Sequence, residues 1–298
     1  MATAPATSTS TSMSLTAPPS RPAGLFWRDR GALVAGAMLV LVAAAAWVFV
    51  VQQASAMGRM EMATPGGTGA VSLTDLSLFL AAWGVMMAAM MLPSALPMIA
   101  LYQLVSRGEP GGRVLPTMLF AASYLLIWLL VGLPVYVASA VVGALAPTSP
   151  VASWLPYGVA AVLVAAGVYQ FSAFKRVCLN QCQSPLSFIM ARWHSGYRAT
   201  LRLGLAHAAY CVGCCWGLMA ILVAAGAMSL PWVLGIAAIV FAEKLLPRGD
   251  WTARGVGALL LVLGIAVAVR PDLAVALRGQ PLSNDIHTSI MGASPAQQ

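Results

Sequence analysis

The chain alternates between long apolar stretches and short polar segments that carry most of its charges. Each apolar stretch holds roughly twenty residues, enough for a helix rising about 1.5 Å per residue to cross a hydrocarbon core of roughly 30 Å. The pattern predicts an all-α fold, a polytopic transmembrane helix bundle of about seven spans. The last two spans are the shortest, and Arg254 has to snorkel for the seventh to cross comfortably. The predicted spans are Gly31–Val51, Leu73–Leu101, Val114–Val142, Val151–Phe171, Thr200–Ala227, Leu230–Leu246 and Gly255–Val269.

The sequence on either side of the apolar region differs in kind. Residues 1–24 are mostly Ala, Thr, Ser and Pro, a composition typical of disordered tails. We expect three parts: a disordered N-terminal tail over 1–24, a transmembrane helical domain over 25–270, and a flexible C-terminal tail over 271–298. The domain contains no convincing internal repeat, so an inverted-repeat transporter is not indicated.

Composition supports the membrane assignment, since 60% of the residues are hydrophobic and only 8% are charged. The net charge of +8 is explained by topology, because Lys and Arg gather in cytoplasmic loops. With a cytoplasmic N-terminus, alternation through the spans puts thirteen basic residues inside and three outside, which predicts a multi-pass membrane protein. The basic residues are spread over several loops, which argues against nucleic acid as a partner. The inner set is Arg21, Arg28, Arg30, Arg107, Arg113, Lys175, Arg176, Arg192, Arg198, Arg202, Lys244, Arg248 and Arg254, and the outer set is Arg59, Arg270 and Arg278.

The fifth predicted span carries the strongest chemical signal, in the run HAAYCVGCCW. At about 100° per residue, His207, Cys211, Cys214 and Cys215 all fall within an arc of about 100° on one helix face. Imidazole and thiolate are the ligands that Cu(I) and Zn(II) prefer, so this stripe predicts an intramembrane metal site. In the alternative reading the cysteines act as small apolar residues between helices and His207 donates to a neighbouring helix.

Two further cysteines, Cys178 and Cys182, lie in the run CLNQCQSP before the fifth span. The charge pattern places this segment in a cytoplasmic loop, where a structural disulfide is not expected. The spacing of four suits two metal ligands one helical turn apart, or an acceptor site at the mouth of a path. The pair can also be incidental, and it lacks the C-x-x-C spacing of a thioredoxin motif.

The second predicted span contains two methionine doublets followed by two prolines, in WGVMMAAMMLPSALP. Met86, Met87, Met90 and Met91 lie close together on the helix, and thioethers bind Cu(I) without losing a proton. Methionine is equally suited to filling irregular gaps between helices. The prolines predict a kink or break near the inner end of this helix.

An acidic residue, Glu243, precedes Lys244 near the inner end of the sixth span. Glu243 is either a hard metal ligand or proton relay, or one half of a snorkelling pair at the membrane interface. The sequence contains no P-loop, no Ser/His/Asp set and no dinucleotide-binding glycine motif, so no catalytic residue or organic cofactor is assigned and enzyme activity is left open.

These motifs resemble an uncharacterised bacterial family of predicted metal-binding integral membrane proteins. The resemblance runs from Trp83 to about Gly264 and includes RWHSGYRATLRLGLAHAAYCVGCCWGLM and AEKLLPRG. It implies a helical membrane domain with a metal site, without a settled reaction. The chain departs from the family pattern at Ala208, where Gly is usual, and at Ser229, where Asn is usual, which puts any role of that amide in doubt. By position, the resemblance marks Cys178, Cys182, His207, Cys211, Cys214, Cys215 and Glu243, and less directly Met86, Met87, Met90 and Met91.

The leading hypothesis is a membrane protein that handles a thiophilic ion, copper first and zinc second. It would deliver the ion to a metalloprotein in the membrane or outside the cytoplasm, or store it, because no ATPase domain is present to drive a pump. Two alternatives remain: a membrane thiol–disulfide oxidoreductase that passes electrons to a quinone, and a structural subunit of a larger membrane complex.

Overall fold

The computed structural model describes residues 30–57, 72–106, 114–145, 149–225 and 230–277, and every regular element in these ranges is a helix. The tail predicted over 1–24 and most of the one predicted over 271–298 lie outside the described residues. The helices are α1 (Arg30–Met57), α2 (Leu73–Val105), α3 (Val114–Leu145), α4 (Ser149–Gln170), α5 (Ala173–Gln183), α6 (Pro185–Arg192), α7 (Tyr197–Ala225), α8 (Leu230–Leu245), α9 (Gly249–Val269) and α10 (Asp272–Leu277).

The all-helical prediction is confirmed, and five of the described helices, α1, α2, α3, α7 and α9, are long and apolar enough to cross a membrane. A sixth candidate span is α4 together with α5, which meet at a bend of 64°. Helix α8 has 16 residues, about 24 Å of helix, which is short for a hydrocarbon core of roughly 30 Å. The described chain therefore supplies five or six candidate spans.

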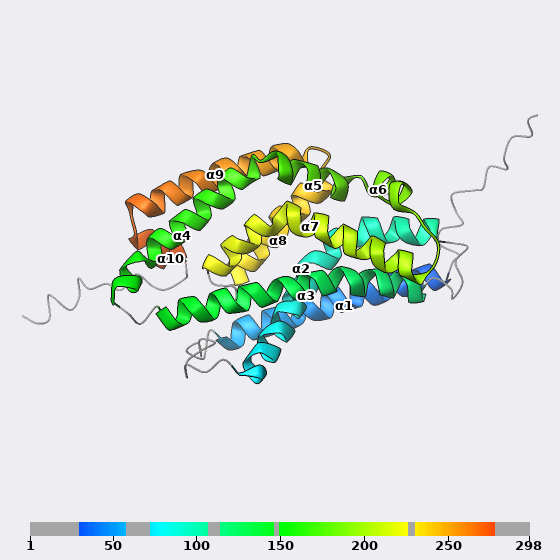
Figure 1. Cartoon of the computed structure of the whole chain (residues 1–298), viewed down its shortest axis with the longest axis horizontal. Helices are drawn as coiled ribbons and strands as arrows, with labels where there is room; N and C mark the ends of the chain where they lie inside the picture. The colour runs from blue at the N-terminus through cyan, green and yellow to red at the C-terminus, as the bar shows by residue number, and fades with distance from the viewer. Residues whose placement is uncertain (1–29, 58–71, 107–113, 146–148, 226–229, 278–298) are drawn as a thin grey trace, which may run out of the picture.

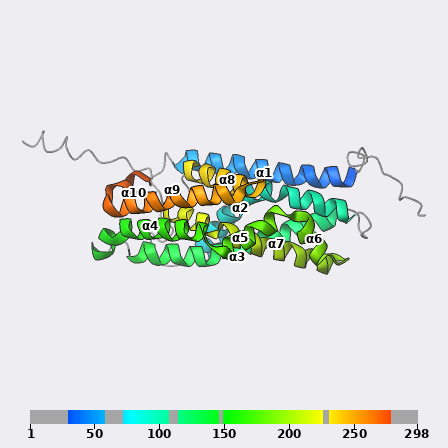
Figure 2. The ribbon, with the colours of Figure 1, turned by 90° about the horizontal axis from the view of Figure 1, so that it is seen from above.

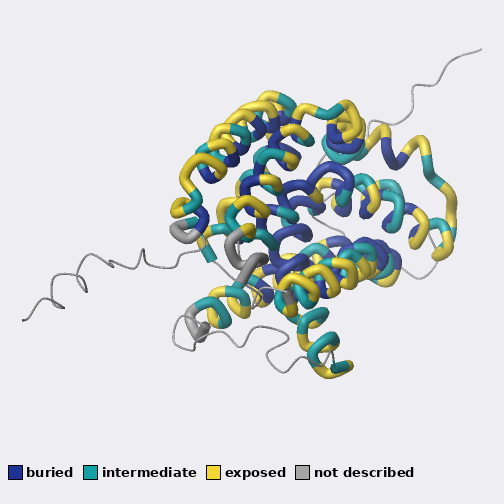
Figure 3. The backbone as a smooth tube through the Cα atoms, turned by 60° about the vertical axis from the view of Figure 1, so that its left-hand side comes forward, coloured by how far each residue is buried: buried dark blue, intermediate teal, exposed yellow. Residues whose placement is uncertain are grey.

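Helix α7 occupies the centre of the bundle. It contacts α3, α4, α5 and α8, while α1 and α2 pack beside α3, and α9 packs along α4. Figure 1 shows α4 and α9 along one side, α1 and α3 along the other, and α7 and α8 between them, and Figure 2 shows the same bundle from above. Burial follows this arrangement, because the buried positions gather toward the middle of the bundle in Figure 3. Side chains on α7 are thus placed in the most enclosed part of the protein.

Small residues allow close approach of α4 and α9. A Cβ on Gly167 would lie 3.1 Å from the carbonyl oxygen of Gly257, and a Cβ on Gly257 would lie 3.1 Å from that of Gly167. Such facing glycines are a common means of packing apolar helices without large side chains between them. Helix α9 begins at Gly249, six residues before the predicted Gly255, and Arg254 lies over the ring of Trp251 at 5.5 Å.

The two prolines of α2 do not break the helix, which is continuous from Leu73 to Val105 through Pro93 and Pro97. Of the predicted kink or break, the break is absent, and the α2 ribbon changes direction along its length in Figure 1. The hydroxyl of Ser94, between the prolines, donates to the carbonyl oxygen of Met91 at 2.9 Å. Ser94 is buried against protein and Pro97 is exposed at a cavity. Proline inside an apolar helix is tolerated where the freed backbone groups face protein or a cavity.

The C-terminal helix α10 lies within residues assigned from sequence to a flexible tail. It contacts α4 and α9, and the indole of Trp232 on α8 donates to the carbonyl oxygen of Leu277 at 2.7 Å. The helical domain therefore continues to at least residue 277.

Candidate metal centre

The four residues of the α7 stripe are all buried. His207 is 3% exposed, and the three cysteines Cys211, Cys214 and Cys215 are 1% exposed or less. Trp216 on the same helix is 48% exposed, so α7 also has an outer face and the stripe lies on the side that neighbouring helices cover. The predicted shared face is thus an interior face.

His207 lies in an aromatic enclosure. Its ring stacks on Tyr124 of α3 at 5.5 Å between centroids and meets Phe188 of α6 edge-on at 5.6 Å, with Phe120 at 6.1 Å. In the described part of the chain its Nδ1 atom is buried and has no hydrogen-bond partner. A buried polar atom without a partner is costly, so this nitrogen is available to a ligand.

Two of the α7 thiols are turned back against their own helix. The thiols of Cys214 and Cys215 donate to the carbonyl oxygen of Cys211 at 3.1 Å and 2.8 Å. Such bonds to the preceding turn satisfy the thiol protons locally. Both thiols therefore lie against the turn of α7 that begins at Cys211.

One sulfur pair bridges two helices. The Sγ atoms of Cys182 on α5 and Cys214 on α7 are 3.9 Å apart. With metal–sulfur bonds of about 2.3 Å, a shared ion would hold these sulfurs at an angle of roughly 120° without a change in their separation. The pair therefore fits a soft ion as two of its ligands.

The segment that carries Cys178 and Cys182 is a helix, α5, and the predicted loop is wrong. Ser172 caps α5 by accepting a hydrogen bond from the backbone N–H of Lys175 at 3.1 Å. Cys178 is buried against α7, where a Cβ on Gly213 would lie 2.6 Å from its Sγ. Gly213 thus lets α5 approach close enough for Cys182 to reach Cys214. The charges of this short segment hid its buried helical face, which Lys175, Cys178 and Leu179 form.

Lys244 is buried among the sulfurs. Its Nζ donates to the Sγ of Cys211 at 2.9 Å and to the Oγ of Ser94 at 3.1 Å. The hydroxyl of Tyr124 lies 3.0 Å from the same sulfur. Cys211 is thereby contacted from α3 and α8, and Lys244 joins α8 to α2. The sequence indicates Lys244 only as an inner basic residue near the end of the sixth span, so its contact with the thiols was not predicted.

Glu243 is directed away from the thiols. Its carboxylate accepts from the ammonium of Lys175 at 2.7 Å and from the amide of Gln170 at 3.1 Å. The Nε2 of Gln183 donates to the backbone carbonyl oxygen of Glu243 at 2.6 Å. Glu243 is 1% exposed and Lys244 is 8% exposed, so the interpretation as a snorkelling interfacial pair is wrong. The two neighbours have different partners.

The methionines of α2 are also interior. Met86, Met87, Met90 and Met91 are all buried, and the carbonyl oxygen of Met91 accepts a hydrogen bond from Tyr124 at 3.4 Å. They belong to the same buried core as the three cysteines of α7. Their burial fits both packing and a reserve of thioether ligands.

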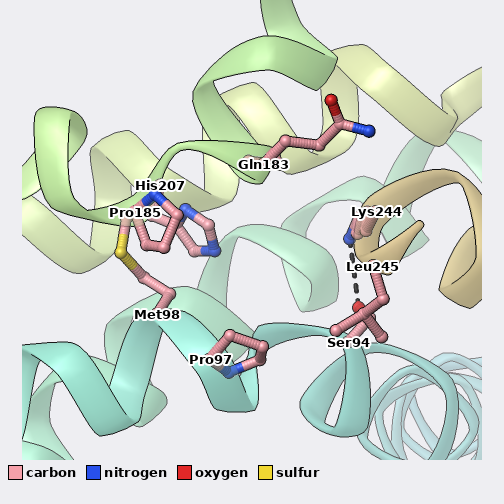
Figure 4. Close-up of a pocket in the computed structure, with 9 residues that line it drawn as sticks. Ser94, Pro97, Met98, Gln183, Pro185, His207, Lys244 and Leu245 are labelled. Carbon is pink, nitrogen blue, oxygen red and sulfur yellow. Dashed lines mark hydrogen bonds between the residues drawn. The ribbon is translucent and has the colours of Figure 1, made fainter. Parts of the chain in front are cut away.

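A cavity of about 190 Å³ adjoins the centre. Figure 4 shows the Lys244–Ser94 hydrogen bond within it, together with His207 and Met98. Met98 was not selected from sequence, although it lies seven residues after Met91 and hence two turns along the same face of α2. The lining residues are Ser94, Pro97, Met98, Cys182, Gln183, Pro185, His207, Lys244 and Leu245.

Within the described ranges, no three His, Cys, Asp or Glu side chains are placed to hold a metal ion together. The structure brings Cys182 to Cys214 and Lys244 to Cys211, but keeps Glu243 in its own ion pair. The thiols lie among buried apolar side chains, with the ammonium of Lys244 and the hydroxyl of Tyr124 beside Cys211. The centre therefore offers an ion a pair of sulfurs, and further ligands only after side-chain rotation.

In its described ranges the chain is all-helical, with five or six candidate apolar spans and a buried group of thiols, thioethers and an imidazole. The family described as PpoB2, copper chaperone, matches residues 80–267, which include all of these side chains. The chain belongs to this copper chaperone family. The match agrees with the metal-related family that the motifs resemble. No curated protein and no solved structure matches the chain.

Proposed function

We propose that the protein carries Cu(I) as cargo inside the membrane and delivers or stores it. The observation that carries the proposal is the sulfur pair Cys182 and Cys214, 3.9 Å apart on two helices at a buried centre. Membership of a copper chaperone family supports copper as the cargo. In this proposal the protein passes the ion from one set of ligands to the next by ligand exchange, and the transfer does not use ATP.

The donor chemistry supports Cu(I) ahead of Zn(II). Structural zinc sites take four nitrogen or sulfur ligands in a closed tetrahedron. Cu(I) is softer, accepts fewer ligands and binds thioethers, which are abundant here on α2. A centre with two adjacent sulfurs, an unpartnered imidazole nitrogen and nearby methionines fits that preference. His207 adds a nitrogen donor near the sulfur pair. Cys178, Cys211, Cys215 and the α2 methionines are further soft groups buried in the same core.

The cavity supports delivery. Cys182 lines the cavity and also contacts Cys214, so it belongs both to the hollow and to the thiol group. His207 and Met98 line the same cavity and offer further soft donors. An ion can therefore move between the cavity and the buried thiols by exchanging one ligand at a time. The receiver is a metalloprotein in the membrane or outside the cytoplasm.

The membrane setting is part of the proposal. Large apolar side chains are exposed on the outer faces of the helices, including Leu41 on α1 and Val262 on α9. Such a surface suits lipid, whereas a soluble protein rarely exposes so much apolar area. We place the protein in a bacterial inner membrane with its N-terminus in the cytoplasm and α8 completing seven spans. Lys175 and Lys244 are buried, so eleven rather than thirteen basic residues support that orientation.

Metal content after purification tests the function. The full chain, purified in mild detergent after growth with copper, is expected to hold copper in proportion to protein, and Cys182→Ser and Cys214→Ser are each expected to lose most of it. Val177→Ser is the control, because it places a serine on an exposed position of α5 away from the sulfurs. Copper-free wild-type protein, or unchanged copper in both cysteine variants, would contradict the proposal.

The same sulfur pair also favours a second function, thiol–disulfide exchange. Cys182 and Cys214 would form a disulfide by giving up two protons and two electrons, with a quinone reduced to quinol. Alkylation of free thiols before and after quinone treatment distinguishes this function. It predicts loss of two reactive thiols that returns on reduction, and absence of the Cys182–Cys214 crosslink would exclude it.

A further inference from the structure

Lys244 is a buried cation without a carboxylate partner. In the described part of the chain its hydrogen-bond acceptors are the sulfur of Cys211 and the hydroxyl of Ser94. The carboxylate next to it in sequence, on Glu243, is paired with Lys175 at 2.7 Å. The cluster of thiols therefore contains one positive charge that no Asp or Glu among the described residues neutralises.

A buried charge without a counter-charge is strongly unfavourable, so the interior around Lys244 favours a state with one compensating negative charge. Thiol groups supply such charge when they bind a metal, because each ligating thiol releases its proton. Two thiolates on Cu(I) carry one net negative charge. Two thiolates on Zn(II) carry none.

We propose that Lys244 is a specificity-determining residue that makes the thiol pair prefer monovalent Cu(I) to divalent Zn(II). The inference rests on the proposed function and adds the reason for its metal preference. With Lys244 present, the Cu(I) dithiolate and the ammonium together are neutral, whereas the Zn(II) dithiolate leaves one positive charge buried. Lys244 acts through charge and is not itself a ligand.

The placement of Lys244 suits this role. Its Nζ is 2.9 Å from Cys211, while Cys182, half of the bridging sulfur pair, lines the same cavity as the lysine. A third thiolate, with which Zn(II) could balance the charge of Lys244, would have to come from Cys211 or Cys215. Cys211 is engaged by Lys244 and Tyr124, and the thiol of Cys215 donates to its own helix. Cys214 donates to the same carbonyl, but its sulfur also meets Cys182 on α5. The pair Cys182 and Cys214 is therefore the one for which the charge of Lys244 is decisive.

The test is a competition between Cu(I) and Zn(II) for the detergent-purified full chain under anaerobic conditions. Bound copper and zinc are measured by mass spectrometry for the wild type, Lys244→Gln and Lys244→Arg. The glutamine keeps a hydrogen-bond donor without the charge, and the arginine keeps the charge. We expect the copper-to-zinc ratio to fall on the order of 10- to 100-fold in Lys244→Gln and to stay near wild type in Lys244→Arg.

A second pair of variants covers the case in which Lys244→Gln does not fold. Ser94→Asp keeps the lysine and sets a carboxylate beside its ammonium, and Ser94→Asn is the uncharged control. The inference predicts that Ser94→Asp lowers the copper-to-zinc ratio and Ser94→Asn does not. Wild-type protein that takes up no copper overturns the proposed function itself. Wild-type protein that takes up copper, with unchanged ratios in Lys244→Gln and Ser94→Asp, overturns the role of Lys244 alone.

Discussion

Two buried lysines, Lys175 on α5 and Lys244 on α8, have opposite surroundings. Lys175 is 1% exposed and pairs with the carboxylate of Glu243, which Gln170 also contacts. Lys244 is 8% exposed and meets only a sulfur and a hydroxyl among its described contacts. The charge of Lys175 is neutralised by Glu243 within the fold. Neutralisation of the charge of Lys244 depends on the thiols and on the ion that they bind. Burial alone therefore does not tell whether a lysine has a structural or a functional role. The group that its ammonium contacts does tell.

The largest expected effect comes from Glu243→Gln, which leaves the ammonium of Lys175 buried without its partner. Breaking a buried ion pair costs about 3–5 kcal/mol, so the free energy of unfolding should fall by about that amount. Thermal and denaturant unfolding in detergent measures it. Copper bound per folded molecule should not change, and its selective loss in a stable variant would make Glu243 a ligand or relay.

A smaller loss of unfolding free energy is expected for Gly213→Ala. Gly213 lies on α7 where that helix packs against α5, the helix that carries Lys175. The added Cβ would lie 2.6 Å from the sulfur of Cys178, so α5 has to shift away from α7. Overpacking of this kind costs about 1–3 kcal/mol, and the shift should also weaken copper binding. Gly235→Ala is the control, because a Cβ there meets nothing within 4 Å. Equal copper affinity in the two variants would show that the α5–α7 contact does not position the sulfurs.

Removing the hydroxyl beside the second lysine should have a modest effect. Ser94→Ala takes away one acceptor of Lys244, 3.1 Å from its Nζ, and leaves the charge and the sulfur contact in place. One lost hydrogen bond is worth about 1 kcal/mol of unfolding free energy. The copper-to-zinc ratio should remain at its wild-type value, and a large change in this ratio would mean that position, rather than charge, sets the preference.

The smallest effect is expected when both members of the first pair are replaced. Apolar residues of similar volume often substitute for a buried ion pair with little or no loss, so Lys175→Leu with Glu243→Leu should lower the free energy of unfolding by less than about 1 kcal/mol. Denaturant unfolding of this double variant and of Glu243→Gln checks this. A double variant less stable than the single one would mean that the pair does more than neutralise its own charges.

Sequence analysis predicted the helical class and the approximate ends of the long helices, because stretches of about twenty apolar residues favour helices in both lipid and protein interiors. It also placed the α7 stripe on one face, which the structure shows to be buried. It missed α5 because a short helix with charged residues and a narrow buried face resembles a loop. It missed Lys244 because the partner of a buried charge depends on how α8 packs against α2 and α7, which no local pattern contains.

X-ray absorption at the copper edge tests the central claim most directly, with the full chain loaded with Cu(I). We predict a Cu(I) edge and a first shell made mainly of sulfur, with at least one sulfur lost in Cys182→Ser and in Cys214→Ser. A first shell of oxygen and nitrogen that is the same in wild type and in both variants would contradict the account.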